Sequence, residues 1–126
     1  MSDEDIIIFY KELSARLPYR VKVEIEGWDG EPVVADMYDI STDKYARIST
    51  EEDCDHIYID QFTPYLRRMA DMTDDEIDEY NHLTSLQNTP ENADKLLEFI
   101  YSHQLDYRNW IDKGVAKQAD NGLYQL

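Results

Sequence analysis

The sequence predicts an α+β fold with an N-terminal helix, a small antiparallel β-meander of about four strands, and a helical C-terminal third. Residues 19–26 alternate strictly between apolar and polar side chains, which is the period of a half-buried strand. Short β-branched and aromatic segments separated by turn residues follow as far as residue 60. Beyond residue 72, helix N-terminal signals replace these strand-like segments.

The N-terminal helix is predicted from a capping residue and an apolar stripe. Ser2 can cap the helix, and the acidic residues that follow suit the positive end of the helix dipole. Pro18 cannot continue a helix, so we expect the helix to end there. Its apolar side chains recur at helical spacing, at Ile6, Phe9, Tyr10, Leu13 and Leu17.

Four strands are predicted between residues 19 and 60, separated by polar turns. In the first strand, Val21, Val23 and Ile25 point to one face, and a glycine-containing turn favours a hairpin with the second strand. The apolar face of this meander needs a cover, which the N-terminal helix and a later helix can supply. The four predicted strands span residues 19–26, 33–40, 45–48 and 56–60.

The character of the chain changes to helix after residue 64, and the clearest start signal is a capping box. In this motif the Thr73 hydroxyl and the Glu76 carboxylate each satisfy a backbone N–H that a helix start leaves unpaired. Met72 and Ile77 flank the box and can form a hydrophobic staple across it. The sequence therefore predicts a helix that begins after Thr73.

Two further helices are predicted closer to the C-terminus. Thr89 and Pro90 start the first of them, with proline at the favoured first helical position. A short last helix has Asp106 as its cap and ends with Lys113 and Gly114, a cation followed by a glycine. The first of these helices presents a buried stripe of Ala93, Leu96, Leu97, Ile100 and Tyr101.

The length of 126 residues, without a linker rich in proline, glycine or serine, predicts a single domain over residues 1–126. Apolar residues make up 42% of the chain, which is enough for a core, so we expect a folded domain and not a disordered acidic tail. The single cysteine, Cys54, cannot form an intramolecular disulfide. Because the N-terminus is anionic and no apolar run is long enough to cross a bilayer, we expect a cytoplasmic protein.

The balance of charge excludes several classes of partner. Twenty-eight acidic residues face twelve basic ones, a formal net charge of −16. Residues 1–83 hold 22 acidic and 8 basic side chains, a net −14, whereas residues 84–126 hold 6 and 4, a net −2. Binding to nucleic acid or to an anionic membrane rests on Lys and Arg, so we expect neither as a direct partner. The expected partner is a basic protein surface.

Acidic and tyrosine residues are the candidate partner-binding groups. Six acidic residues crowd one helix start, where they either dock on a basic protein or simply stabilise the helix dipole. Ten tyrosines exceed what a small core must bury, and those on predicted strands either share an exposed docking face or pack with their hydroxyls at its rim. For Arg67 and Arg68 we expect internal ion pairs. The candidates are Asp71, Asp74, Asp75, Glu76, Asp78 and Glu79 on the helix, and Tyr38, Tyr45 and Tyr58 on the strands.

The leading hypothesis is therefore a non-enzymatic, acidic interaction protein that needs no cofactor. An alternative is a small metal-dependent hydrolase that uses Cys54, His56 and neighbouring carboxylates, although the spacing lacks the second Cys or His pair of structural zinc sites. A third possibility is a structural or assembly protein that forms homo-oligomers through a sheet edge. No nucleotide-binding loop, nucleophile elbow or calcium-loop motif occurs in the sequence.

The second half of the chain resembles a group of uncharacterised small proteins carried by phages, prophages and other mobile elements of gut anaerobes. Pro64-Tyr65-Leu66-Arg67 with Met69, Met72-Thr73-Asp74-Asp75-Glu76 with Tyr80, and Asp106-Tyr107-Arg108 with Ile111-Asp112-Lys113-Gly114-Val115-Ala116 carry the resemblance. The resemblance implies no established activity and no catalytic residues. It implies only an accessory protein of a mobile element. The net charge of −14 on residues 1–83 and the surplus of tyrosine add the hypothesis that such a protein is a modulator or nucleic-acid mimic of host machinery.

Overall fold

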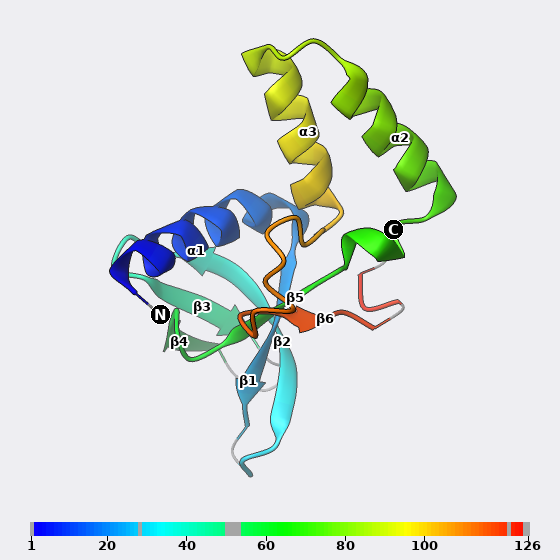
Figure 1. The fold of residues 1–126 in the computed structure, drawn as a ribbon. Coiled ribbons are helices and arrows are strands. Elements are labelled where there is room, and N and C mark those ends of the chain that lie inside the picture. Colours follow the sequence, from blue (N-terminus) through cyan, green and yellow to red (C-terminus); the bar gives the residue numbers. More distant parts are fainter. Residues whose placement is uncertain (1, 28, 50–53, 121, 125–126) are drawn as a thin grey trace.

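The computed structural model describes residues 2–27, 29–49, 54–120 and 122–124, and it confirms the predicted α+β class. A helix, α1, precedes a mixed and mostly antiparallel sheet, and further helices follow (Figure 1). The elements are α1 (Asp3–Arg16), η1 (Leu17–Tyr19), β1 (Val21–Glu26), β2 (Pro32–Ile40), β3 (Tyr45–Ser49), β4 (Cys54–Tyr58), β5 (Thr63–Leu66), η2 (Met69–Asp71), α2 (Asp74–Ser85), α3 (Pro90–Ser102) and β6 (Lys117–Gln118).

The sheet has the strand order β4-β3-β2-β1-β5-β6, in which only the β5–β6 pair is parallel. The predicted β1–β2 hairpin is present, with Val21 opposite Met37 and Val23 opposite Ala35. The register of β2 and β3 shifts between Met37 and Asp39, which leaves Tyr38 at a bulge.

The main core lies between α1 and one face of the sheet. Val21 and Val23 point into it from β1, and Phe9 and Leu13 cover them from α1, as the stripe in α1 predicts. Trp110 packs edge-on against Phe9, with 5.1 Å between the ring centroids. The long connection after α3 therefore contributes to the core.

A second apolar cluster holds the α2–α3 hairpin together. Phe99 and Ile100 of α3 are buried with Leu105, and Tyr80 and Leu83 of α2 pack against them. Figure 1 shows this hairpin projecting away from the sheet. Its helices begin with the predicted caps, because the Thr73 and Thr89 side chains accept backbone N–H groups of their first turns.

The sheet has six strands and not about four, because two short strands lack local signals. Residues 63–66 form β5, so the predicted change to helix after residue 64 is wrong at that point. This strand pairs with β1 and with β6, which lies about fifty residues further along the chain. The fourth strand ends at Tyr58, before the predicted residue 60, because a turn closes there with a 2.9 Å bond from Gln61 N–H to the Tyr58 carbonyl.

The predicted last helix is wrong, and Asp106 binds backbone N–H groups four and five residues further on where a helix cap would bind those two or three residues on. The Asp106 carboxylate accepts the Trp110 and Ile111 backbone N–H groups at 2.8 and 2.9 Å. Asn109 has a φ of 63°, which breaks a right-handed helix, so turns at residues 107–108 and 110–114 take the place of the helix. The predicted staple also differs, since Ile77 is 38% exposed while Met72 packs against the hairpin cluster.

Tyr124 joins β1 and β5 where their own ladder stops. Its hydroxyl accepts the Lys22 N–H at 2.9 Å and donates to the Tyr65 carbonyl at 2.7 Å. Burial raises the pKa of Tyr124, so the phenol keeps the proton that it donates. We expect Tyr124→Phe to destabilise the protein by about 1–2 kcal/mol, because two partly buried backbone groups lose their partner.

Urea unfolding followed by circular dichroism measures this loss. Tyr19→Phe is the matched control, because the Tyr19 hydroxyl donates to the Glu98 carboxylate at the surface and not to a buried backbone group. Equal stabilities of the two variants would contradict the role assigned to Tyr124.

Candidate functional site

The first two turns of α2 carry a surface of exposed carboxylates. Asp74, Asp75, Asp78 and Glu79 are all exposed, and no Lys or Arg occurs in α2. We call these four residues the acidic helix surface. Residues 69–102 as a whole hold nine acidic side chains and one basic one, a net −8. The projecting hairpin is therefore a strongly negative part of the molecule.

Asp71, the sixth acidic candidate, is exposed just before α2, and its carboxylate accepts a hydrogen bond from Gln118 Nε2 at 2.9 Å.

Glu76 does not belong to this surface, which corrects the prediction that grouped it with its acidic neighbours. Its carboxylate accepts Arg67 Nη2 and Nη1 at 2.7 and 2.8 Å, and also the Thr73 N–H at 2.8 Å. The Arg67 hydrogen bonds lower the pKa of Glu76 from its ordinary value of 4.5 to about 2. The ion pairs predicted for the two arginines are both present: Arg67 pairs with Glu76, and Arg68 Nη1 lies 2.9 Å from Asp112 Oδ1.

The three candidate tyrosines lie on the sheet face opposite α1. Tyr45 and Tyr58 are cross-strand partners with ring centroids 5.1 Å apart, and the Tyr38 hydroxyl contacts the Cys54 thiol. The Arg47 guanidinium lies 5.0 Å from the Tyr38 ring centre, on the same face. Figure 1 places β3 and β4 on the far side of the fold from α2. The tyrosine face and the acidic helix surface are therefore two separate surfaces.

Cys54 and His56 lie two residues apart on the exposed edge strand β4. The Cys54 thiol contacts the Tyr38 hydroxyl, and among the described residues no hydrogen bond joins this thiol to His56. Among the residues that the structure describes, no three His, Cys, Asp or Glu side chains are grouped so that they could hold a metal ion. The acidic residues 51–53 of the predicted cluster lie outside the described residues.

A buried polar network between α1 and the segment after α3 was not predicted. Glu12 Oε2 accepts the hydroxyls of Tyr101 and Tyr107 at 2.9 and 2.8 Å. Arg16 lies 3.5 Å from Glu12 Oε1 and donates to the Leu105 carbonyl at 2.7 Å. Burial lowers the pKa of Arg16 and raises those of both tyrosines.

The sequence does hold a signal for this network. Glu12 and Arg16 fall on the same side of α1 as Phe9 and Leu13, so charges at these positions must be buried and paired. Their partners come from about ninety residues further along the chain, however, and no local pattern identifies them.

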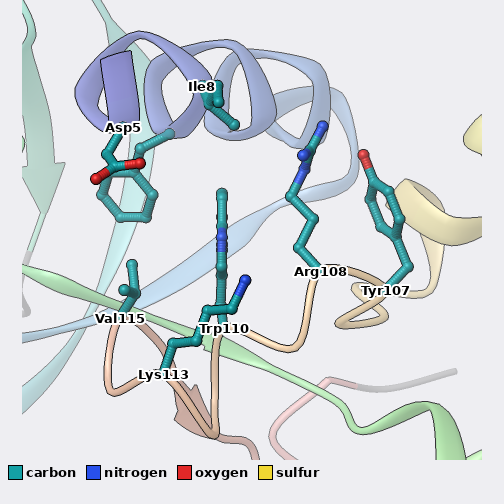
Figure 2. Close-up of a pocket in the computed structure, with 8 residues that line it drawn as sticks. Asp5, Ile8, Tyr107, Arg108, Trp110, Lys113 and Val115 are labelled. Carbon is teal, nitrogen blue, oxygen red and sulfur yellow. The ribbon is translucent and has the colours of Figure 1, made fainter. Parts of the chain in front are cut away.

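A pocket of about 580 Å³ lies next to this network, between α1 and the turns after α3 (Figure 2). Arg108 connects the pocket to the network, because its Nε lies 3.5 Å from Glu12 Oε1. The pocket is lined by Asp5, Ile8, Phe9, Tyr107, Arg108, Trp110, Lys113 and Val115.

In comparisons with known proteins, no family model, no curated protein and no solved structure matches the chain. Among the described residues, no helix combines the length and the apolar composition that crossing a membrane requires.

Proposed function

We propose that this protein is a non-enzymatic binding protein whose acidic helix surface docks on a basic surface of a partner protein. The observation that supports this most is the set of four exposed carboxylates on a helix without Lys or Arg. Fields of one sign attract oppositely charged surfaces over a Debye length and speed their encounter. The expected cellular form is a cytoplasmic modulator or nucleic-acid mimic of a phage or mobile element.

The arrangement of the carboxylates within α2 favours a binding role. Asp74 and Asp78, and likewise Asp75 and Glu79, stand four residues apart, so like charges are neighbours on the helix surface. Such pairs each destabilise a helix by about 0.2–0.5 kcal/mol, and the helix dipole offsets this only in the first turn. Positive charges on a basic partner surface would attract these carboxylates and offset the repulsion between them.

Ile77 adds an apolar contact at the border of the acidic helix surface. The helical period places it beside the row formed by Asp74 and Asp78, and its side chain is 38% exposed. Protein interfaces commonly combine an apolar anchor with a polar rim. We expect Ile77 to be such an anchor, with the carboxylates setting the orientation of the partner.

Neutralising the surface tests the proposal. We expect the variant Asp74→Asn, Asp75→Asn, Asp78→Asn, Glu79→Gln to bind its partner at least about tenfold more weakly at low salt, because exposed charge pairs contribute about 0.2–1 kcal/mol each. The measurement is the Kd of the partner retained from host lysate by the wild-type protein, purified and titrated at low and high ionic strength.

The control has the same net charge. Glu26→Gln, Glu31→Gln, Asp55→Asn and Asp60→Asn together remove four exposed carboxylates from the sheet and its turns, so both variants carry a net charge of −12. Equal weakening by both sets would mean that overall charge governs binding, and a partner affinity insensitive to salt would contradict docking through carboxylates.

A further inference from the structure

The pocket beside α1 has a charge opposite to that of the protein as a whole. Arg108 and Lys113 line it together with a single carboxylate, Asp5, in a chain with a net charge of −16. In the part of the chain that the structure describes, the Lys113 ammonium forms no ion pair. A guanidinium has five N–H donors, so the contact of Arg108 with Glu12 leaves donors for a ligand.

The remaining walls of the pocket are mainly apolar. Phe9 and Trp110 belong to the main core and hold each other edge-on, and Ile8 and Val115 complete the wall. A volume of about 580 Å³ is typical of sites for small organic molecules. Because its base is part of the core, the pocket exists before any ligand arrives.

We propose that this pocket binds a small aromatic carboxylate. The ligand carboxylate would accept bonds from Arg108 and Lys113, while its ring packs against Trp110 and the apolar wall. Figure 2 shows Asp5 and Arg108 on opposite sides of the Trp110 indole, with Tyr107 beyond Arg108. Asp5 can therefore accept a hydroxyl group at the far end of the ring.

The anions around the pocket favour a carboxylate over a phosphate. Asp5 lines the pocket, and Glu12 lies directly behind Arg108. A dianion would be repelled by both more strongly than a monoanion would be. This proposal is independent of the acidic helix surface, because no residue of α2 lines the pocket.

The test is a titration with 3-(4-hydroxyphenyl)propionate, followed through the indole N–H signals of the protein by NMR. The chain has two tryptophans, and Trp110→Phe assigns the signal that belongs to the pocket. We expect this signal to shift saturably. Lys113→Gln should weaken binding by at least about fivefold, since a charge-assisted hydrogen bond is lost. Lys95→Gln, on the exposed surface of α3, removes the same charge and should leave the Kd unchanged.

Two further comparisons define the ligand class. Asp5→Asn should weaken binding of the hydroxylated probe but not of 3-phenylpropionate, and the remaining NMR signals show whether each variant is folded. No saturable shift up to roughly 10 mM probe would overturn the proposal. Equal binding of the uncharged alcohol 3-(4-hydroxyphenyl)propanol would also overturn it, as would tighter binding of phenyl phosphate. None of these results bears on docking through α2.

Discussion

Glu12→Met is expected to destabilise the protein by about 3–5 kcal/mol, the range found when one partner of a buried ion pair is removed. Glu12 and Arg16 are 3% and 1% exposed, so the remaining guanidinium cannot turn to water. Arg108 is 38% exposed at its side chain and can reorient. Tyr101 and Tyr107 would also lose the shared acceptor of their hydroxyl protons.

A double-mutant cycle separates the charge from the packing. Arg16→Met in the Glu12→Met background replaces both ions by apolar side chains, and we expect it to restore part of the lost stability. Glu12→Gln should fall between wild type and Glu12→Met, because the amide oxygen still accepts the tyrosine hydroxyls. Urea unfolding of the wild type, the single variants Glu12→Met and Arg16→Met, and the double methionine variant gives the coupling energy. A double variant less stable than Glu12→Met would show that the stability lost in Glu12→Met does not come from leaving the Arg16 charge unpaired.

Local signals in the sequence predicted the elements that local chemistry forms. The Thr73 capping box, the alternation in β1 and the stripe of α1 depend on residues within a few positions of one another, and each appears in the structure. The strands β5 and β6 could not be predicted in this way. Four residues including Pro64, and two residues at Lys117–Gln118, become strands only because remote segments offer them hydrogen-bond partners.

The candidate site shows the same limit. Helical spacing accounts for the exposure of Asp74, Asp75, Asp78 and Glu79. The burial of Glu76 depends instead on Arg67, which directly follows β5 and pairs with the Glu76 carboxylate. The pocket could not be predicted from spacing, because its walls join α1 to turns about a hundred residues later. Asp106 accepts backbone N–H groups of the segment that follows it, but the positive φ of Asn109 prevents the helix that Asp106 was predicted to cap.

Arg67→Met is the second variant from which a large loss is expected, about 3 kcal/mol at neutral pH, because it leaves the buried Glu76 carboxylate without its counter-charge. Arg67 also donates from Nη1 to the His103 carbonyl at 3.2 Å, so its guanidinium ties the start of α2 to the end of α3. Arg68→Met is the control, since the Arg68–Asp112 pair is largely exposed and such pairs contribute at most about 1 kcal/mol.

The pH dependence of stability distinguishes loss of the Glu76 charge pair from loss of packing. The folded pKa of Glu76, about 2, lies below its ordinary 4.5, so the ionised carboxylate stabilises the fold fully above pH 4.5 and loses this effect as pH falls toward 2. At 1.36 kcal/mol per pKa unit, the shift corresponds to about 3 kcal/mol. The wild-type protein should therefore lose stability across this window, whereas Arg67→Met, in which Glu76 can protonate at higher pH, should approach the wild type as pH falls. Chemical unfolding at pH 7, 4.5 and 3 measures both proteins, and a gap between them that stays constant with pH would mean that Arg67 acts through packing alone.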